Sequence, residues 1–173
     1  MPTDTPIPQP GDELCADRGL YKHHGFYIGN NAVVQLGGRV KDKPRASVHH
    51  VSYAEFAKDD RVQVVEQDHL DRAGAVRRAL WLLDNPPPMS YHLFGYNCEH
   101  VARWCATGKI QSRQARDALT VNSLIGGGLF VFVEQPHGWL VGLVQLIFGL
   151  LLAWLSRGST RRFEQHIRDN WSG

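Results

Sequence analysis

The sequence predicts an α+β fold: a small antiparallel sheet with a helix packed on it, followed by a hydrophobic, helical C-terminal extension. Short runs rich in Tyr, Phe, Ile and Val are separated by turn residues, as antiparallel strands are. Two segments with helical spacing of apolar residues accompany them. The composition then changes near residue 122, after which long stretches carry no charge. Strands and helices segregated in this way are typical of the α+β class.

The chain of 173 residues fits one ordinary domain with accessory segments. We divide it into a mobile, proline-rich arm over 1–10, a catalytic domain over 11–121 and a hydrophobic C-terminal segment with a basic tail over 122–173. The net charge of +2 is too small to predict nucleic-acid binding.

The first strands form a predicted hairpin over residues 20–36. Its two apolar runs flank Gly29-Asn30-Asn31, three residues that tolerate a positive φ. Residues 48–51 and 62–66 are predicted strands, and the capping spacing of Ser52 and Glu55 predicts a short helix between them.

Two longer helices are predicted. The first runs from Asp68 to Leu83, ends before three consecutive prolines, and is expected to turn one apolar face inward. That face comprises Leu70, Ala73, Val76, Leu80 and Leu83. The second helix runs from about Asn97 to Thr107 and stops at Gly108, with Val101, Trp104 and Cys105 inward.

Cys98 is the candidate nucleophile, because it falls in the first turn of the second helix. A helix N-terminus carries unpaired N–H groups and partial positive charge, which favour a thiolate and can hold an oxyanion. His100 lies only two residues away, so a base should come from elsewhere. His23 and His24 are the candidates, and strand alternation puts them on opposite faces without deciding between them. Gln35, on the paired strand, could orient the active imidazole.

Three sequence blocks resemble the lecithin:retinol acyltransferase family, a circularly permuted branch of the NlpC/P60 thiol enzymes with a papain-like fold. They are PGDEL, LYKHHGFYIG with the following VVQL, and YNCEHVARWCATGK. The resemblance covers about Pro10 to Gln114 and implies that Cys98 is the nucleophile and His23 the general base. Gln35 stands where most relatives carry a second histidine, and would orient His23.

The resemblance also implies the reaction. Acyl transfer would pass through a thioester on Cys98, with a glycerophospholipid ester as donor and water, an alcohol or an amine as acceptor. No metal or other cofactor is expected. A first alternative is a cysteine peptidase or amidase. A second is a binding module in which the change at Gln35 marks decayed catalysis.

The other cysteines and histidines have less specific patterns. Three cysteines form neither a disulfide framework nor a CxxC metal pair. We therefore expect Cys105 to be a core residue and Cys15 to have a structural role only. Four other histidines lack the spacing of metal ligands, and their side chains are expected to be solvated or to have hydrogen-bond partners within the fold: His49, His50, His69 and His92.

Residues 139–155 carry no charge and have Trp139 and Trp154 near their ends. Seventeen residues lie at the lower edge of the length that crosses a bilayer of about 30 Å. We expect membrane association through this run, as a single span, as half of a hairpin with 118–133, or inserted in the membrane plane; the alternative is a buried helix. A start without a basic or apolar run is unlike a signal peptide, so the catalytic domain is expected in the cytoplasm.

Overall fold

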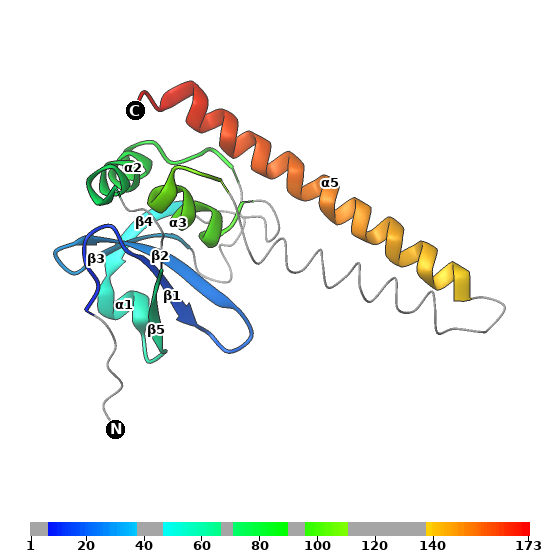
Figure 1. Cartoon of the computed structure of the whole chain (residues 1–173), viewed down its shortest axis with the longest axis horizontal. Coiled ribbons are helices and arrows are strands. Elements are labelled where there is room, and N and C mark those ends of the chain that lie inside the picture. The colour runs from blue at the N-terminus through cyan, green and yellow to red at the C-terminus, as the bar shows by residue number, and fades with distance from the viewer. Residues whose placement is uncertain (1–6, 38–46, 67–70, 90–95, 111–137) are drawn as a thin grey trace. The chain divides into compact units, whose positions relative to one another are not determined.

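A computed structural model describes residues 7–37, 47–66, 71–89, 96–110 and 138–173. The chain divides into two compact units, one formed by Met1–Tyr91 and Asn97–Gln111 and the other by His92–Tyr96 and Ser112–Gly173 (Figure 1). The predicted arm lies mostly outside the described ranges, as does the predicted domain boundary at 121/122.

The first unit is built on a five-stranded antiparallel sheet, which confirms the predicted fold class. Its strands are β1 (Glu13–Asp17), β2 (Lys22–Gly29), β3 (Ala32–Gly37), β4 (Ser47–Ser52) and β5 (Val62–Val65). Their order across the sheet is β4-β3-β2-β1-β5, which places β2 in the centre. Strand β1 has no counterpart in the sequence prediction.

The predicted hairpin is present as β2 and β3. Asn30 and Asn31 occupy the turn with φ angles of 50° and 61°. Two consecutive positive φ angles suit the right-handed twist of the flanking strands, and asparagine adopts them at low cost. The turn therefore sets the register in which Gly25 pairs with Gln35.

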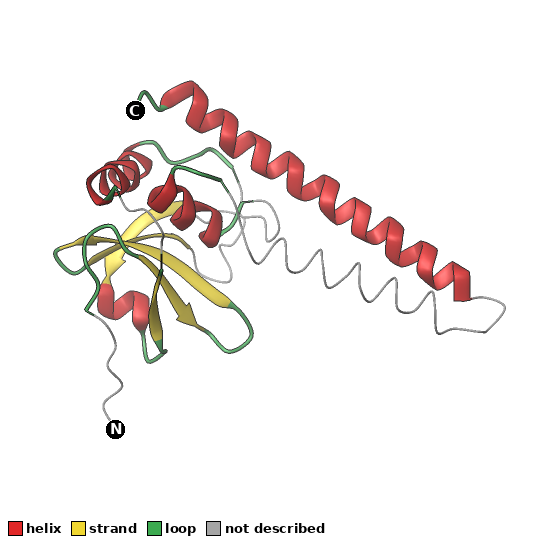
Figure 2. Ribbon diagram, viewed as in Figure 1, coloured by secondary structure: helices red, strands yellow, loops and turns green. Residues whose placement is uncertain are grey.

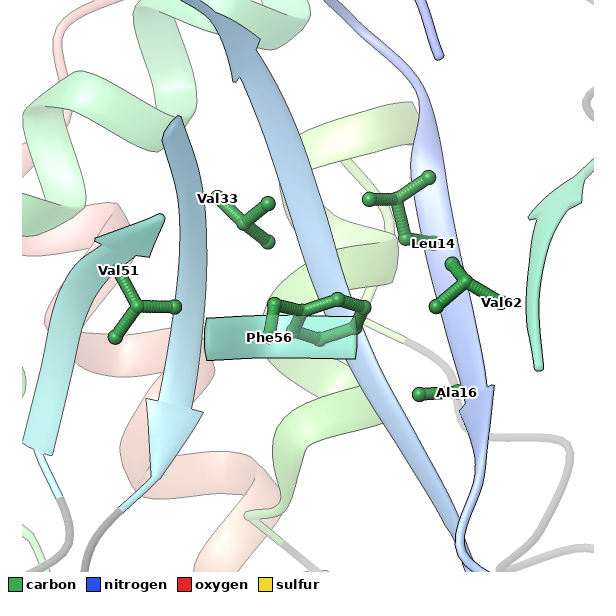
Figure 3. Packing of buried hydrophobic residues seen from close by; sticks show 6 residues of the cluster. All are labelled: Leu14, Ala16, Val33, Val51, Phe56 and Val62. Carbon is green, nitrogen blue, oxygen red and sulfur yellow. The ribbon is translucent and has the colours of Figure 1, made fainter. Parts of the chain in front are cut away.

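Helix α1 (Tyr53–Ala57) confirms the predicted short helix. The side chain of Ser52 accepts a hydrogen bond from the backbone N–H of Glu55 at 3.1 Å. Phe56 is completely buried and packs into a cluster on one face of the sheet (Figure 3). The other buried members of that cluster are Leu14, Ala16, Val33, Val51 and Val62.

Helices α2 (Arg72–Asp84) and α3 (Cys98–Thr107) lie on the opposite face of the sheet from α1 (Figure 2). Helix α3 confirms the prediction closely: Asn97 is its N-cap and Gly108, with a φ of 70°, is its C-cap. Glycine tolerates that left-handed conformation, which ends the helix. The capped α3 presents Cys98 at its N-terminus, against the sheet.

Helix α2 departs from the prediction in its start and in its buried face. Asp71 rather than Asp68 caps it, and Leu80 is 45% exposed. The buried residues are Gly74, Ala75, Ala79 and Leu82. Small residues let the helix approach its neighbour closely, and Arg78 donates hydrogen bonds to the carbonyls of Cys105 and Ala106 at 2.8 and 3.1 Å. These contacts with α3, rather than the predicted apolar face, determine which side of α2 is buried.

The second unit contains the long helix α5 (Gly138–Asn170) and confirms the helical C-terminal extension. Phe163 is buried against Tyr96, with ring centroids 5.0 Å apart. No helix in the described ranges is both long and apolar enough to cross a membrane, which corrects the prediction of a span in 139–155. Residues 118–133, the other half of the predicted hairpin, lie outside those ranges.

Candidate active site

Cys98 is held in the first turn of α3 by a strong cap. The side chain of Asn97 accepts hydrogen bonds from the backbone N–H of His100 at 3.0 Å and from its ring Nδ1 at 2.9 Å. Burial lowers the pKa of His100 to about 4, so its ring is neutral and supplies the Nδ1–H donor. Because Asn97 satisfies the His100 N–H, the earlier N–H groups of the helix remain directed at the thiol.

The thiol of Cys98 is buried, and its pKa is raised from 9.0 to about 11. Desolvation is the dominant cause, because it penalises the charged thiolate. Hydrogen bonds from the backbone N–H groups of His24, Glu99 and Cys98 itself act in the opposite direction and do not offset it. The N–H groups at the helix N-terminus therefore favour the thiolate, as expected, but burial outweighs them and keeps the thiol protonated at rest.

The same contacts fix the position of the thiol. Its hydrogen bond with the backbone N–H of His24 brings the N-terminus of α3 to strand β2, at the residue that follows His23. The structure records no hydrogen bond between the Cys98 thiol and the His23 ring, both of which it describes. The Cys98 thiol therefore lies at the β2 backbone next to His23, whose side chain is turned to the α1 face of the sheet.

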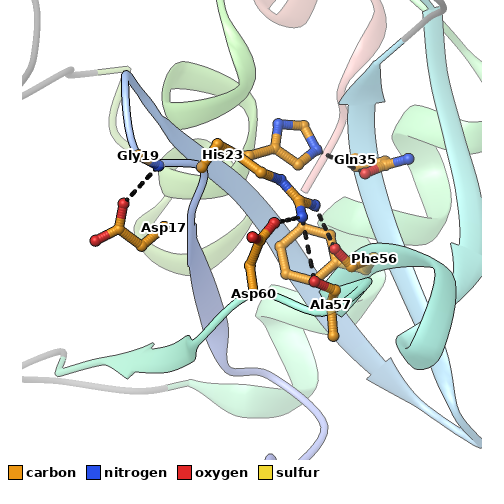
Figure 4. A network of polar contacts seen from close by, with 8 residues as sticks. Asp17, Gly19, His23, Gln35, Phe56, Ala57 and Asp60 are labelled. Atoms are coloured by element: carbon orange, nitrogen blue, oxygen red, sulfur yellow. Dashed lines mark hydrogen bonds and ion pairs between the residues drawn. The ribbon is translucent and has the colours of Figure 1, made fainter.

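His23 lies on the α1 face of the sheet in a well-defined environment (Figure 4). Its Nε2 is 2.7 Å from Oε1 of Gln35, and its ring centroid is 5.4 Å from that of Phe56. Burial lowers the pKa of His23 below 6.5, against the hydrogen bond to Gln35 and together with the nearby charge of Arg18. His23 is therefore neutral at pH 7, the state in which an imidazole can accept a proton.

Arg18 anchors α1 beside His23. Its guanidinium donates hydrogen bonds to the backbone carbonyls of Phe56 and Ala57 and pairs with the Asp60 carboxylate (Figure 4). These bonds satisfy the end of the short helix and hold the Phe56 ring against the imidazole.

Gln35 continues the contacts of His23 to a third residue. Its Nε2 is 3.1 Å from Nε2 of His49, and the Nδ1 of His49 is 2.9 Å from the carbonyl oxygen of Ser47. The sequence predicts no catalytic role for His49, which has no recognisable spacing to the other site residues. His49 contacts Gln35 because the two residues are paired across β3 and β4, and the sequence alone does not predict this register.

His24 lies on the opposite face and has the opposite charge state. Burial disfavours its charged form, but hydrogen bonds to Cys15 and to Glu13, at 3.0 Å for the latter, outweigh it and raise the pKa to about 9. Glu13 is completely buried and also lies 3.8 Å from Arg103. His24 is therefore an imidazolium at neutral pH and cannot act as a base.

The remaining cysteine has a structural environment. Cys105 is completely buried, as predicted, and burial strongly raises the pKa of its thiol. Within the part of the chain that the structure describes, no three His, Cys, Asp or Glu side chains are grouped so as to hold a metal ion.

Comparison with known proteins places this arrangement in a family. The family model described as "Lecithin retinol acyltransferase" matches residues 6–111. The human protein named "Phospholipase A and acyltransferase 3" is 28% identical, over 75% of this chain and 89% of its own length. The mouse protein of the same name is also 28% identical, over 72% and 86%. The match includes His23, Gln35 and Cys98 and most of the described first unit, so the chain belongs to the lecithin retinol acyltransferase family.

Proposed function

We propose that this protein is a thiol-dependent acyltransferase or phospholipase that acts on glycerophospholipid esters through an acyl thioester on Cys98. The observation that carries the proposal is a neutral His23, hydrogen-bonded to Gln35, on the strand whose backbone contacts the Cys98 thiol. Family membership, and the names of the human and mouse relatives, support an acyltransferase or phospholipase in general. The residue roles and the thioester are our proposal.

The first half-reaction forms the thioester. Cys98 Sγ attacks the ester carbonyl while the free ring nitrogen of His23 accepts the thiol proton, so the C–S bond forms as the carbonyl electrons move onto oxygen. Backbone N–H groups in the first turn of α3 stabilise that oxyanion. When the tetrahedral intermediate collapses, the C–O bond to the glycerol breaks, and the leaving alkoxide takes the proton from the His23 imidazolium.

The second half-reaction repeats these steps with a new nucleophile. Water, an alcohol or an amine loses a proton to His23 as it attacks the thioester, and the C–S bond breaks as the Cys98 sulfur takes that proton back from the His23 imidazolium. Because the pKa of the thiol is raised to about 11, proton removal must accompany attack rather than precede it. This requirement makes a correctly placed neutral imidazole essential.

The charge states favour His23 over His24 as the base. His23 has a lowered pKa and is a neutral base at pH 7, whereas His24 has a pKa raised to about 9 and is protonated. His24 serves the site through its backbone N–H, which contacts the thiol. We therefore assign the base to His23 and its orientation to Gln35.

The exposed apolar surface of α5 supports a lipid as the substrate. Between residues 143 and 154 this helix exposes Leu143, Val144, Leu146, Ile147, Phe148, Leu150, Leu151 and Trp154. A large exposed apolar patch is typical of a surface that binds a protein or a lipid. We infer that α5 lies against the lipid surface that supplies the substrate, without crossing it.

The proposal is tested by turnover of phosphatidylcholine vesicles, followed as the release of lysophospholipid. Cys98→Ala should abolish release, because it removes the thiol on which the thioester forms. Cys105→Ala is the matched control, since this thiol lies two turns further along α3 and plays no part in the reaction. Release by Cys98→Ala at the rate of the unmodified protein would contradict the mechanism.

A further inference from the structure

We propose that His49 is a positioning residue that fixes the orientation of the Gln35 amide and, through it, the tautomer of His23. His49 lies outside the three residues to which we assign the reaction. Its effect on catalysis rests on the proposed function, whereas its effect on the tautomer of His23 does not.

The backbone carbonyl of Ser47 fixes which ring nitrogen of His49 carries the hydrogen. A carbonyl oxygen can only accept a hydrogen bond, so the Nδ1 of His49, 2.9 Å away, must carry a hydrogen. A neutral imidazole has a single N–H, which leaves Nε2 of His49 as an acceptor. The atom of Gln35 that faces it, at 3.1 Å, must therefore be the amide nitrogen, which donates.

The orientation of Gln35 then determines the state of His23. With its nitrogen directed at His49, the Gln35 amide presents its oxygen to Nε2 of His23 at 2.7 Å. The amide oxygen accepts, so His23 Nε2 carries the hydrogen and Nδ1 keeps the free lone pair. A base needs such a lone pair, so this tautomer is the one that can take the proton of Cys98.

An amide needs this constraint because its two ends have nearly the same shape and opposite polarity. If the Gln35 amide rotated by half a turn, its NH₂ group would face His23 and occupy the Nε2 lone pair. His23 would then carry its hydrogen on Nδ1 and would have no free lone pair. His49 prevents this rotation, since the rotated amide would place its oxygen against the unprotonated Nε2 of His49.

The position of His49 suits this role. It lies on β4, an edge strand, directly opposite Gln35 in the β3–β4 pairing. Its side chain is only half-buried, so it contributes little to the core. A substitution here therefore changes the hydrogen-bonding chain more than the packing of the sheet.

The direct test reads the tautomer of His23 in the full chain labelled with ¹⁵N-histidine, using long-range ¹H–¹⁵N correlation spectra. His23→Ala identifies the His23 signals by their loss. The unmodified protein and His49→Gln, whose amide oxygen can accept from Gln35, should show the hydrogen on Nε2 of His23. His49→Lys can only donate, so it should turn the Gln35 amide and move the hydrogen to Nδ1. An unchanged His23 tautomer in His49→Lys would overturn the proposal.

The second test measures the rate of acyl-enzyme formation in the same variants. His49→Lys should slow it by about 10- to 100-fold, as expected for a disturbed proton-transfer partner, and His49→Gln should recover most of the rate. In a Gln35→Glu background the effect of His49→Lys should vanish, because a carboxylate accepts at both oxygens in either orientation. A loss that persists in that background means that the lysine substitution disrupts the fold instead, and contradicts the positioning role. If the unmodified protein forms no acyl-enzyme, the proposed function fails, while the His23 spectra still decide the role of His49.

Discussion

At the scale of single residues, the site depends on two adjacent histidines with opposite charge states. The intrinsic pKa of both side chains is 6.5. Burial, together with the nearby charge of Arg18, lowers the pKa of His23, whereas hydrogen bonds to Cys15 and Glu13 raise that of His24. Strand alternation gives the two side chains these different surroundings, because it turns neighbouring side chains toward opposite faces of the sheet.

The resting thiol should react slowly with a small alkylating reagent. Because burial raises the pKa of Cys98 to about 11, little thiolate is present at pH 7.5. Iodoacetamide should therefore alkylate Cys98 more slowly than it alkylates a cysteine in an unstructured peptide, as followed by peptide mass. An equal or faster rate would mean that His23 deprotonates the thiol before substrate binds.

The buried pair of His24 and Glu13 should make stability depend on pH. The pKa of His24 is raised from 6.5 to about 9 in the folded state, so its stabilisation is complete below 6.5 and is lost as the pH rises through about 9. The free energy of unfolding in urea should fall by about 2 to 3 kcal/mol over that interval.

The His24→Gln variant should lack most of this decrease, although it should be less stable at pH 6.5. His50→Gln, at an exposed position of β4, is the matched control and should keep the decrease. Parallel pH curves for the unmodified protein and His24→Gln would show that the charge on His24 does not stabilise the fold.

At the scale of elements, local signals predicted what local chemistry determines. The Asn30-Asn31 turn, the Ser52 cap of α1 and the Gly108 end of α3 each act over a few residues, and each is where the sequence placed it. The nucleophile helix was predictable for this reason, and so was the strand that carries His23.

The elements that were missed depend on contacts between distant segments. Strand β1 directs Glu13 into the interior, where Arg103 and His24 pair with it, so its sequence does not alternate as a half-buried strand should. The buried face of α2 is decided by small residues and by the bonds of Arg78 to α3. His49 contacts Gln35 only because the β3–β4 register places the two residues opposite each other.

Strand β2 should tolerate no side chain at Gly25. A Cβ there would lie 2.6 Å from Cε2 of Phe56 and 2.7 Å from Cγ1 of Val33, both in the core. Gly25→Ala should therefore destabilise the protein by about 1 to 3 kcal/mol, the usual cost of overpacking. It should also slow acylation, because Phe56 packs against the His23 ring.

The control for this substitution is Gly158→Ala in α5, where an added Cβ meets nothing within 4 Å. That change should stabilise by about 0.5 to 1 kcal/mol, since alanine favours a helix interior. Thermal unfolding measures both variants. A Gly25→Ala protein as stable as the unmodified one would show that the packing of Phe56 on β2 is looser than the distances indicate.

At the scale of the whole molecule, the two compact units divide the tasks that the proposed reaction requires. The first unit carries Cys98, His23 and Gln35, and the second carries the exposed apolar residues of α5. The sequence predicted the hydrophobic segment, and a membrane span was one of the forms expected for it, because seventeen uncharged residues approach the required length. Helix α5 instead continues past that run to Asn170 through an arginine-rich segment.

Charges on α5 should reduce activity only where the substrate is a lipid surface. Ile147 and Leu151 are 56% and 48% exposed, so Ile147→Asp with Leu151→Asp should leave stability nearly unchanged. Turnover of phosphatidylcholine vesicles should fall at least tenfold relative to turnover of dispersed short-chain lipid. Leu80→Asp, on the exposed side of α2, is the control and should leave that ratio unchanged. An equal loss of turnover on both substrates would contradict the proposal that α5 contacts the lipid surface.

The measurement that tests the central claim most directly is the intact mass of the protein after brief incubation with phosphatidylcholine vesicles and acid quenching. The mechanism predicts an added mass equal to one acyl chain, on the peptide that contains Cys98 and removable by neutral hydroxylamine, as a thioester is. The adduct should be absent in Cys98→Ser and His23→Ala and present in Cys105→Ser. An acyl adduct of the same size and yield in Cys98→Ser would contradict the assignment of Cys98 as the nucleophile.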